Sequence, residues 1–199
     1  MDHYCIKDGY TARTSYTHYD DLALNDEYQL EVYLHALGLM KKYQLNSVLD
    51  IGCGSGYKLV TYLGEYDTTG IELPVNVDFL KQKYPARHWI TKDFSEAMDR
   101  PYDVIICSDV VEHLPDPDVL LEFISKMQFN FLVMSTPERD LLYFGGKPGG
   151  EGPPANPAHV REWNNVEFND YLSRKFQVID LRICNLAQCT QLAIARKFT

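Results

Sequence analysis

The chain has 199 residues, of which 45% are hydrophobic and 24% charged, so it can build one substantial core and is short for two. Its net charge of −9 and its pI of about 5.1 describe an acidic surface that repels phosphate backbones, so we expect no nucleic-acid partner. Without a membrane-length apolar run or a secretion signal, and with five scattered cysteines, the chain is expected to be cytoplasmic and to have no membrane partner.

The first half of the chain begins with an arm and continues with alternating strands and helices. Residues 1–24 show no period and are expected to form an N-terminal arm or lid. A helix is predicted to follow, with Asn25 as its N-cap and an apolar stripe that reaches Met40. Beyond it, the sequence predicts strands over 47–51, 68–71, 88–90 and 104–107 and helices over 57–63 and 75–84.

The second half continues the alternation around one unusual segment. Asp116 followed by Pro117 predicts the start of a helix, and a strand is predicted over 129–134. In 145–157, nine of thirteen residues are Gly or Pro, which predicts a loop. Asn164 and Glu167 have the spacing of a capping box, and strands over 176–183 and 190–195 are predicted to be antiparallel neighbours.

Strands that alternate with helices predict an α/β fold, a three-layer αβα sandwich around a mostly parallel sheet with an antiparallel last strand. No repeat or long linker divides the chain, so we expect one domain over 1–199, as a monomer or homodimer. Within it, 1–24 is expected to form the arm or lid and 137–160 a loop on the substrate side.

A glycine-rich loop follows the first strand, where Asp50 precedes Gly52, Cys53, Gly54 and Gly56. Such glycines allow a sharp turn and the close approach of a ligand, although a tight structural turn is the alternative. A carboxylate just before the loop repels the pyrophosphate of a dinucleotide and suits the ammonium and sulfonium of S-adenosylmethionine (SAM). The spacing also differs from the Gly-x-Gly-x-x-Gly of dinucleotide sites, so SAM is favoured over NAD.

Glu72 follows the second strand, 20 residues after Gly52, where an acid can accept hydrogen bonds from both hydroxyls of a ribose. With these residues, the chain resembles the class I SAM-dependent methyltransferase family over residues 45–135. The resemblance implies a seven-stranded Rossmann-like sheet with SAM bound at the carboxyl ends of its strands. It also implies the following SAM-binding residues: Asp50, Gly52, Cys53, Gly54 and Gly56 in the loop, Glu72 at the ribose, Leu73, Asp93 and Phe94 at the adenine, and Ser108 and Asp109 at the strand end facing the methyl group.

A cluster of acids and histidines follows the fourth strand. Asp109, Glu112 and His113 have the spacing of one helix face, and His159 comes 46 residues after His113. These groups can serve as general base, as ligands of a divalent metal, or as both; a helix-cap pair and a structural loop histidine are the alternatives.

The same cluster carries a second resemblance. The segment from Asp109 to Pro117 resembles ubiquinone-pathway O-methyltransferases, and with His159-Val160-Arg161-Glu162-Trp163 it is similar to small-RNA 3′-terminal 2′-O-methyltransferases. In the latter, acids and histidines at the positions of Asp109, Glu112, His113 and His159 hold a divalent cation, which makes a metal possible here. The chain departs from that pattern by having Asp109 where Glu is usual.

Two segments are predicted to cover the site. Residues 145–157 are expected to close over the acceptor, with a disordered loop as the alternative. Residues 9–13, with Tyr16 and Tyr19, are expected to fold over SAM so that Arg13 pairs with its carboxylate, with a solvated arm as the alternative.

Together these patterns predict a SAM-dependent methyltransferase that methylates a small-molecule acceptor, first of all at a hydroxyl oxygen, and produces S-adenosylhomocysteine (SAH). His113, His159 and Glu112 are the predicted catalytic residues, with His113 or His159 taking the hydroxyl proton. The alternatives are an RNA 2′-O-methyltransferase, an N- or carboxyl-methyltransferase, a catalytically inactive SAM-binding regulatory protein and, more remotely, an NAD-binding protein.

Overall fold

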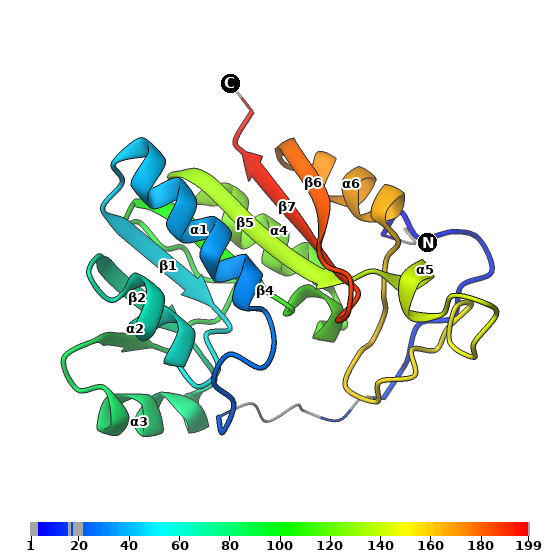
Figure 1. Ribbon diagram of the computed structural model, residues 1–199, viewed down its shortest axis with the longest axis horizontal. Helices are drawn as coiled ribbons and strands as arrows, with labels where there is room; N and C mark the ends of the chain where they lie inside the picture. The colour runs from blue at the N-terminus through cyan, green and yellow to red at the C-terminus, as the bar shows by residue number, and fades with distance from the viewer. Residues whose placement is uncertain (1–3, 16, 18–21, 199) are drawn as a thin grey trace.

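A seven-stranded sheet forms the centre of the computed structural model, which describes residues 4–15, 17 and 22–198 (Figure 1). The strand order is β3-β2-β1-β4-β5-β7-β6. The strands are β1 (Ser47–Ile51), β2 (Asp67–Ile71), β3 (His88–Ile90), β4 (Tyr102–Ser108), β5 (Phe129–Pro137), β6 (Gln177–Asn185) and β7 (Thr190–Arg196). The first five strands are parallel, and β7 pairs antiparallel with both β5 and β6, which confirms the predicted α/β sheet with an antiparallel last strand.

Helices cover both faces of the sheet and complete the three layers (Figure 1). The helices are α1 (Leu30–Tyr43), α2 (Tyr57–Leu63), α3 (Pro74–Lys83), the 3₁₀ helix η1 (Val111–His113), α4 (Pro117–Lys126), α5 (Arg139–Leu142) and α6 (Asn165–Ser173). Successive strand residues point to opposite faces, so Val104 and Ile106 pack with α1, α2 and α3, while Ile105 and Cys107 pack with α4 and α6. Within the described ranges, every helix is too short or too polar to cross a bilayer.

Helix ends agree with the sequence where the capping signal is local. Asp116 accepts a hydrogen bond from the backbone N–H of Asp118 and caps α4. At α6, Asn164 and Glu167 form the predicted capping box. The short helix α5 was not predicted from the sequence.

The predicted start of the first helix at Asn25 is wrong, because α1 begins only at Leu30. Gln29, just before it, has a left-handed φ of 66°, which breaks the helical path. The turn between β6 and β7 holds this segment: Gln188 donates from its side-chain amide to the carbonyl oxygen of Glu27 at 2.6 Å, and its amide oxygen accepts from the Gln29 N–H at 3.4 Å. A contact 159 residues away in the sequence thus overrides the local cap signal.

The loop over 145–157 contains neither helix nor strand, as predicted, and lies beside the N-terminal arm. Backbone hydrogen bonds join Thr11 N to Glu151 O at 2.8 Å and Arg13 N to Val160 O at 2.8 Å. The segment just after the loop also reaches η1, since Val160 N donates to Glu112 O at 2.8 Å. The arm and the loop therefore pack together next to the predicted acid–histidine cluster.

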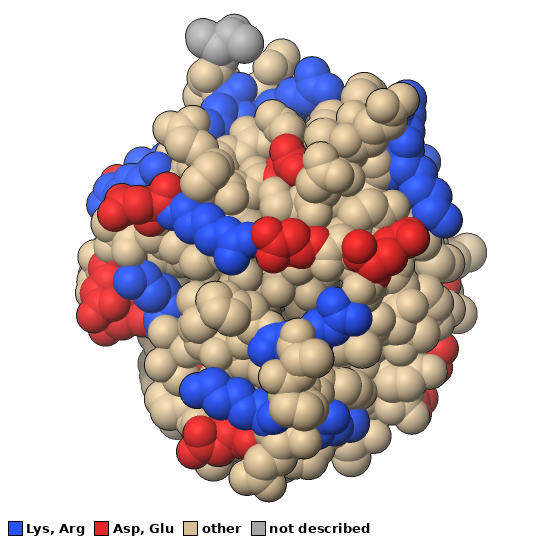
Figure 2. All heavy atoms as spheres, turned by 90° about the vertical axis from the view of Figure 1, so that its left-hand side faces the viewer, with Lys and Arg blue, Asp and Glu red and all other residues tan. Residues whose placement is uncertain are grey.

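The charged surface is mixed on the face that carries α2 and α3. Figure 2 shows Lys and Arg side chains interspersed with Asp and Glu there, rather than gathered into a stripe of one sign. The whole chain carries 19 basic and 28 acidic residues, so positive charge is not in excess. Such a surface offers little electrostatic attraction to a phosphate backbone.

Candidate functional site

The glycine loop turns at the carboxyl end of β1. Gly52 and Gly56 have left-handed φ angles of 73° and 68°. A Cβ at Gly52 would lie 2.4 Å from the Cγ2 of Val110, and one at Gly56 would lie 2.8 Å from the ring of Trp89. Both positions therefore require glycine, for their backbone conformation and for the space they leave. Gly54 also has a left-handed φ, of 52°, so all three glycines of the Gly-x-Gly-x-Gly spacing carry the turn.

Asp50, at the end of β1, is fully buried beneath this loop. The hydroxyl of Tyr33 in α1 donates to its Oδ2 at 2.8 Å. Lys58 in α2 lies over the ring of Tyr33, with Nζ 5.5 Å from the ring centroid. Tyr33 was missed by the sequence reasoning, because an apolar helix position gives no sign of the partner that its hydroxyl will meet.

Glu72 lies at the carboxyl end of β2 and faces the glycine loop. Its Oε2 accepts from the Gly54 N–H at 2.9 Å, and its Oε1 accepts from the Leu73 N–H at 2.8 Å. Leu73 is 45% exposed, an apolar surface beside the carboxylate. The geometry brings Glu72 and the loop together, while the ribose contact of Glu72 and the adenine contact of Leu73 stay predictions.

Asp93 and Phe94 lie beyond β3, next to the same edge of the sheet. Asp93 is exposed, and its Oδ1 accepts from the Ser95 N–H at 2.8 Å. This backbone hydrogen bond lowers the pKa of the Asp93 carboxyl, because it stabilises the ionised form. Phe94 is partly buried against Phe123, with ring centroids 5.2 Å apart. Their contacts with adenine stay predictions.

Asp109 follows β4 with a left-handed φ of 52°, unusual for a residue other than glycine. Its Oδ1 accepts from the Ser135 hydroxyl at 2.6 Å, and Ser135 Oγ lies 2.9 Å from the Oγ of the buried Ser108. Burial raises the pKa of the Asp109 carboxyl, opposed by hydrogen bonds from Ser135 and Gln29. Backbone strain of this kind is typical of functional sites. Ser135 and Gln29 were not singled out in the sequence.

Glu112 in η1 is a buried carboxylate with incomplete hydrogen bonding. It is 0% exposed, and its Oε2 accepts from the hydroxyl of Thr136 at 3.0 Å. Among the described residues, none donates a hydrogen bond to its Oε1. Burial, and after it the negative charge of Asp109, hold the pKa of Glu112 well above its usual range. A buried acceptor without a donor is a place where a ligand can bind.

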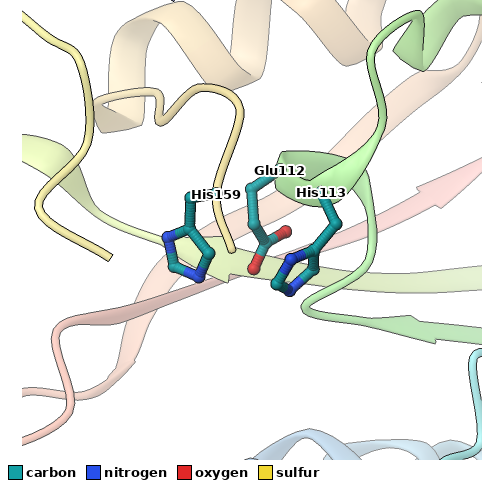
Figure 3. A group of neighbouring side chains, drawn as sticks. All are labelled: Glu112, His113 and His159. Carbon is teal, nitrogen blue, oxygen red and sulfur yellow. The ribbon is translucent and has the colours of Figure 1, made fainter. Parts of the chain in front are cut away.

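Two histidines flank this carboxylate, and the three side chains face one another (Figure 3). The ligand atoms offered by Glu112, His113 and His159 all lie within 4.8 Å of one another. His113 places Nδ1 2.9 Å from the carbonyl oxygen of Ala158, and its ring meets that of His159 edge-on, with centroids 4.9 Å apart. The structure thus unites two segments that are 46 residues apart.

Asp109, the fourth predicted metal ligand, is not part of this group, although it lies near enough to raise the pKa of Glu112. Arg13 lies on the arm, where its Nε donates to the carbonyl of His159 at 3.2 Å and its guanidinium also contacts the carbonyl of Pro154. Its predicted pairing with the carboxylate of SAM stays a prediction. Tyr16 and Tyr19, predicted to fold over SAM, lie outside the described residues.

Comparison with known proteins identifies the class of this site. Residues 23–182 match the family model of methyltransferase domains. The ubiquinone biosynthesis O-methyltransferase of Pseudomonas savastanoi pv. phaseolicola is 33% identical over 89 residues, which span 40% of this chain and 38% of that protein. The chain therefore matches well under half the length of this curated relative.

Solved structures share the fold at low sequence identity. The magnesium protoporphyrin IX methyltransferase of Synechocystis, with bound SAH, has a TM-score of 0.67 at 16% identity, covering 85% of this chain and 83% of that one. The N-methyltransferase NodS of Bradyrhizobium japonicum, also with SAH, has a TM-score of 0.65 at 17% identity, covering 90% and 95%. At such identities the likeness shows the fold.

Proposed function

The chain belongs to the family of methyltransferase domains, as a class I enzyme that uses SAM as its methyl donor, and on this premise we propose that it methylates a hydroxyl oxygen of a small-molecule acceptor. The product from the cofactor is then SAH. The match to a ubiquinone biosynthesis O-methyltransferase supports a small acceptor and an oxygen as the acceptor atom. We place that acceptor under the 145–157 loop, beside η1.

The observation that carries this proposal is the convergence of Glu112, His113 and His159 at the carboxyl end of β4. Ligands of open parallel sheets bind at that end, where the glycine loop and Glu72 also lie. A neutral amine is already a good nucleophile, whereas a hydroxyl oxygen is a weak one until a base takes its proton. A paired set of imidazoles is the chemistry that a hydroxyl acceptor needs.

In the proposed step, an oxygen lone pair of the acceptor attacks the methyl carbon of SAM in line with the C–S bond. The C–O bond forms while the C–S bond breaks, and its electron pair goes to sulfur, so the sulfonium becomes the neutral thioether of SAH. The hydroxyl proton passes to an imidazole. His113 suits this role, because its Nδ1–H donates to Ala158 O and its lone pair is on Nε2.

A divalent cation would fit the same residues. Glu112 offers a buried oxygen to which no described residue donates, and two imidazoles lie beside it, a ligand set that suits several transition metals. When bound, such a cation would polarise the acceptor hydroxyl. Glu112, His113 and His159 would hold it, with Asp109 next to them as a source of negative charge.

The test is a radiolabelled SAM assay against phenols, sugars, carboxylic acids, amines and a short RNA, each with and without EDTA. We expect transfer to a hydroxyl acceptor, and we expect His113→Ala to lose turnover by about 10²-fold or more with nearly unchanged SAM affinity. His88→Ala is the matched control, since this exposed histidine starts the edge strand β3, while His113 follows the central strand β4.

Other outcomes would replace the proposal. Methylation of amines or carboxylates alone would overturn the hydroxyl assignment, and methylation of RNA would overturn the small acceptor. SAM binding without turnover on any acceptor would favour a regulatory protein. Full activity in the presence of EDTA would exclude a catalytic cation and leave the histidine as general base.

A further inference from the structure

Glu162 lies on the segment that follows the loop, three residues after His159, and is 1% exposed. Its Oε1 lies 2.5 Å from Nδ1 of His159. An ionised carboxylate can only accept, so the proton of this short hydrogen bond belongs to Nδ1. Glu162 therefore contacts one ring nitrogen of His159, Nδ1, and the other, Nε2, faces Asn156.

Tyr143 holds the other oxygen of Glu162. Its hydroxyl oxygen accepts from the Ala155 N–H at 2.8 Å and lies 2.8 Å from Glu162 Oε2. The single hydroxyl proton is therefore donated to Glu162. Burial raises the pKa of the Tyr143 phenol well above its ordinary value, which keeps that proton in place. Both oxygens of the carboxylate are thereby oriented by donors.

The contact at the other ring nitrogen of His159, Nε2, independently indicates that the proton is on Nδ1. Asn156 Oδ1 accepts from the Ala158 N–H at 2.9 Å, which orients the amide so that its Nδ2 faces His159 Nε2, also at 2.9 Å. An amide N–H donates only to a nitrogen that carries its lone pair. The contacts at the two ring nitrogens therefore define one tautomer, with the proton on Nδ1 and the lone pair on Nε2.

From these contacts we propose that Glu162, held by Tyr143, is a positioning residue that fixes His159 as the Nδ1–H tautomer and so presents the lone pair of Nε2 to the acceptor or a cation. The inference rests on the proposed function, because the proposed methyl transfer is the reaction in which the Nε2 lone pair would act. In this structure the Asn156 side chain donates to the Nε2 lone pair. A ligand at Nε2 would replace this one hydrogen bond. Carboxylate partners orient catalytic and metal-binding histidines in the same way in general.

Glu162→Gln tests this directly, because Tyr143 dictates how the new amide lies. The Tyr143 hydroxyl still needs an acceptor, so it takes the amide oxygen of Gln. The amide NH₂ then faces Nδ1 of His159 and requires a lone pair there, so the imidazole proton moves to Nε2 and the Asn156 amide turns its oxygen toward that proton. We expect kcat to fall by about 10²–10⁴-fold, while the KM for SAM changes by no more than about twofold.

Adding Tyr143→Phe should partly reverse the effect. Without the tyrosine hydroxyl, the Gln amide can turn its oxygen to Nδ1, so the Glu162→Gln/Tyr143→Phe double variant should recover about tenfold or more of the lost kcat. A purely structural role predicts the opposite, since the double variant loses more hydrogen bonds. Glu138→Gln is the matched control: this buried carboxylate accepts from the backbone N–H groups of Leu141 and Asn165, and we expect its kcat to stay within about threefold of the wild type.

The imidazole ¹⁵N NMR spectrum of His159 reads the tautomer without any acceptor. We expect the Nδ1–H form in the wild type and the double variant and the Nε2–H form in Glu162→Gln. The same tautomer in all three proteins, or a double variant slower than Glu162→Gln, would overturn the inference. If no acceptor is ever methylated, the proposed function fails while the NMR result still decides the tautomer.

Discussion

Replacement of Glu112 by Gln should stabilise the protein while removing its activity. The side chain is 0% exposed, one carboxylate oxygen has no donor among the described residues, and the negative charge of Asp109 lies nearby. Gln keeps the shape and can still accept from the Thr136 hydroxyl, while its NH₂ faces the two histidines. A buried unsatisfied group costs about 1–3 kcal/mol, so we expect the free energy of unfolding to rise by about that amount.

For a domain of this size, 1 kcal/mol corresponds to about 2–4 °C in Tm, so the variant should melt about 2–12 °C higher than the wild type. The measurement is thermal unfolding without SAM or added metal, with turnover and SAM affinity recorded on the same samples. Glu122→Gln is the control, because this partly exposed glutamate of α4 pairs with the surface residues Lys126 and Lys175, and we expect a change within about 0.5 kcal/mol. A lower Tm for Glu112→Gln, or wild-type turnover, would refute the reasoning.

Three further predictions concern the glycine loop, its support and a cysteine. Gly52→Ala should weaken SAM binding about tenfold or more in calorimetric titration, because the left-handed backbone and the 2.4 Å clash both oppose a Cβ; Gly38→Ala, where the structure leaves open space, should not. Tyr33→Phe should destabilise the fold by about 1–3 kcal/mol in urea unfolding, because Asp50 loses a buried donor; an unchanged midpoint would contradict this. Burial and the charge of Asp109 raise the pKa of Cys184 from 9.0 to about 11. At pH 8 its thiolate fraction, and with it the rate of alkylation by iodoacetamide, should therefore be about 100-fold below that of a thiol with pKa 9.0. The alkylation rate should rise about tenfold per pH unit up to pH 10, and a plateau below pH 9 would refute the raised pKa.

Local patterns were sufficient for most of the fold. Strands over 47–51 and 88–90 and the helix over 57–63 lie where apolar runs and glycines predicted them, because each element depends on neighbouring residues. The Asp116 cap and the Asn164 capping box are interactions across two or three residues, so they too can be read from the sequence. The short helix α5 was not predicted, and the predicted start of α1 was wrong, since the β6–β7 turn holds the backbone before it.

The candidate site divides along the same line. The sequence by itself determined the class of cofactor. Asp50, the glycines and Glu72 act through backbone geometry and charge at the ends of strands, and the alternation of strands and helices sets where those ends lie in the fold. It also singled out Glu112, His113 and His159. Only the tertiary structure decided that these three side chains meet and that Asp109 turns instead to Ser135. It also decided which oxygen of Glu112 receives no hydrogen bond from the described residues.

Three partners that complete the site, Tyr33, Thr136 and Tyr143, came from the tertiary structure as well, and so did the contact of Glu162 with His159. A buried hydrogen bond depends on the orientation of two side chains, and that orientation results from packing between segments distant in sequence. No local pattern encodes it: Tyr143 reads as an ordinary aromatic residue until the loop brings Ala155 and Glu162 to its hydroxyl.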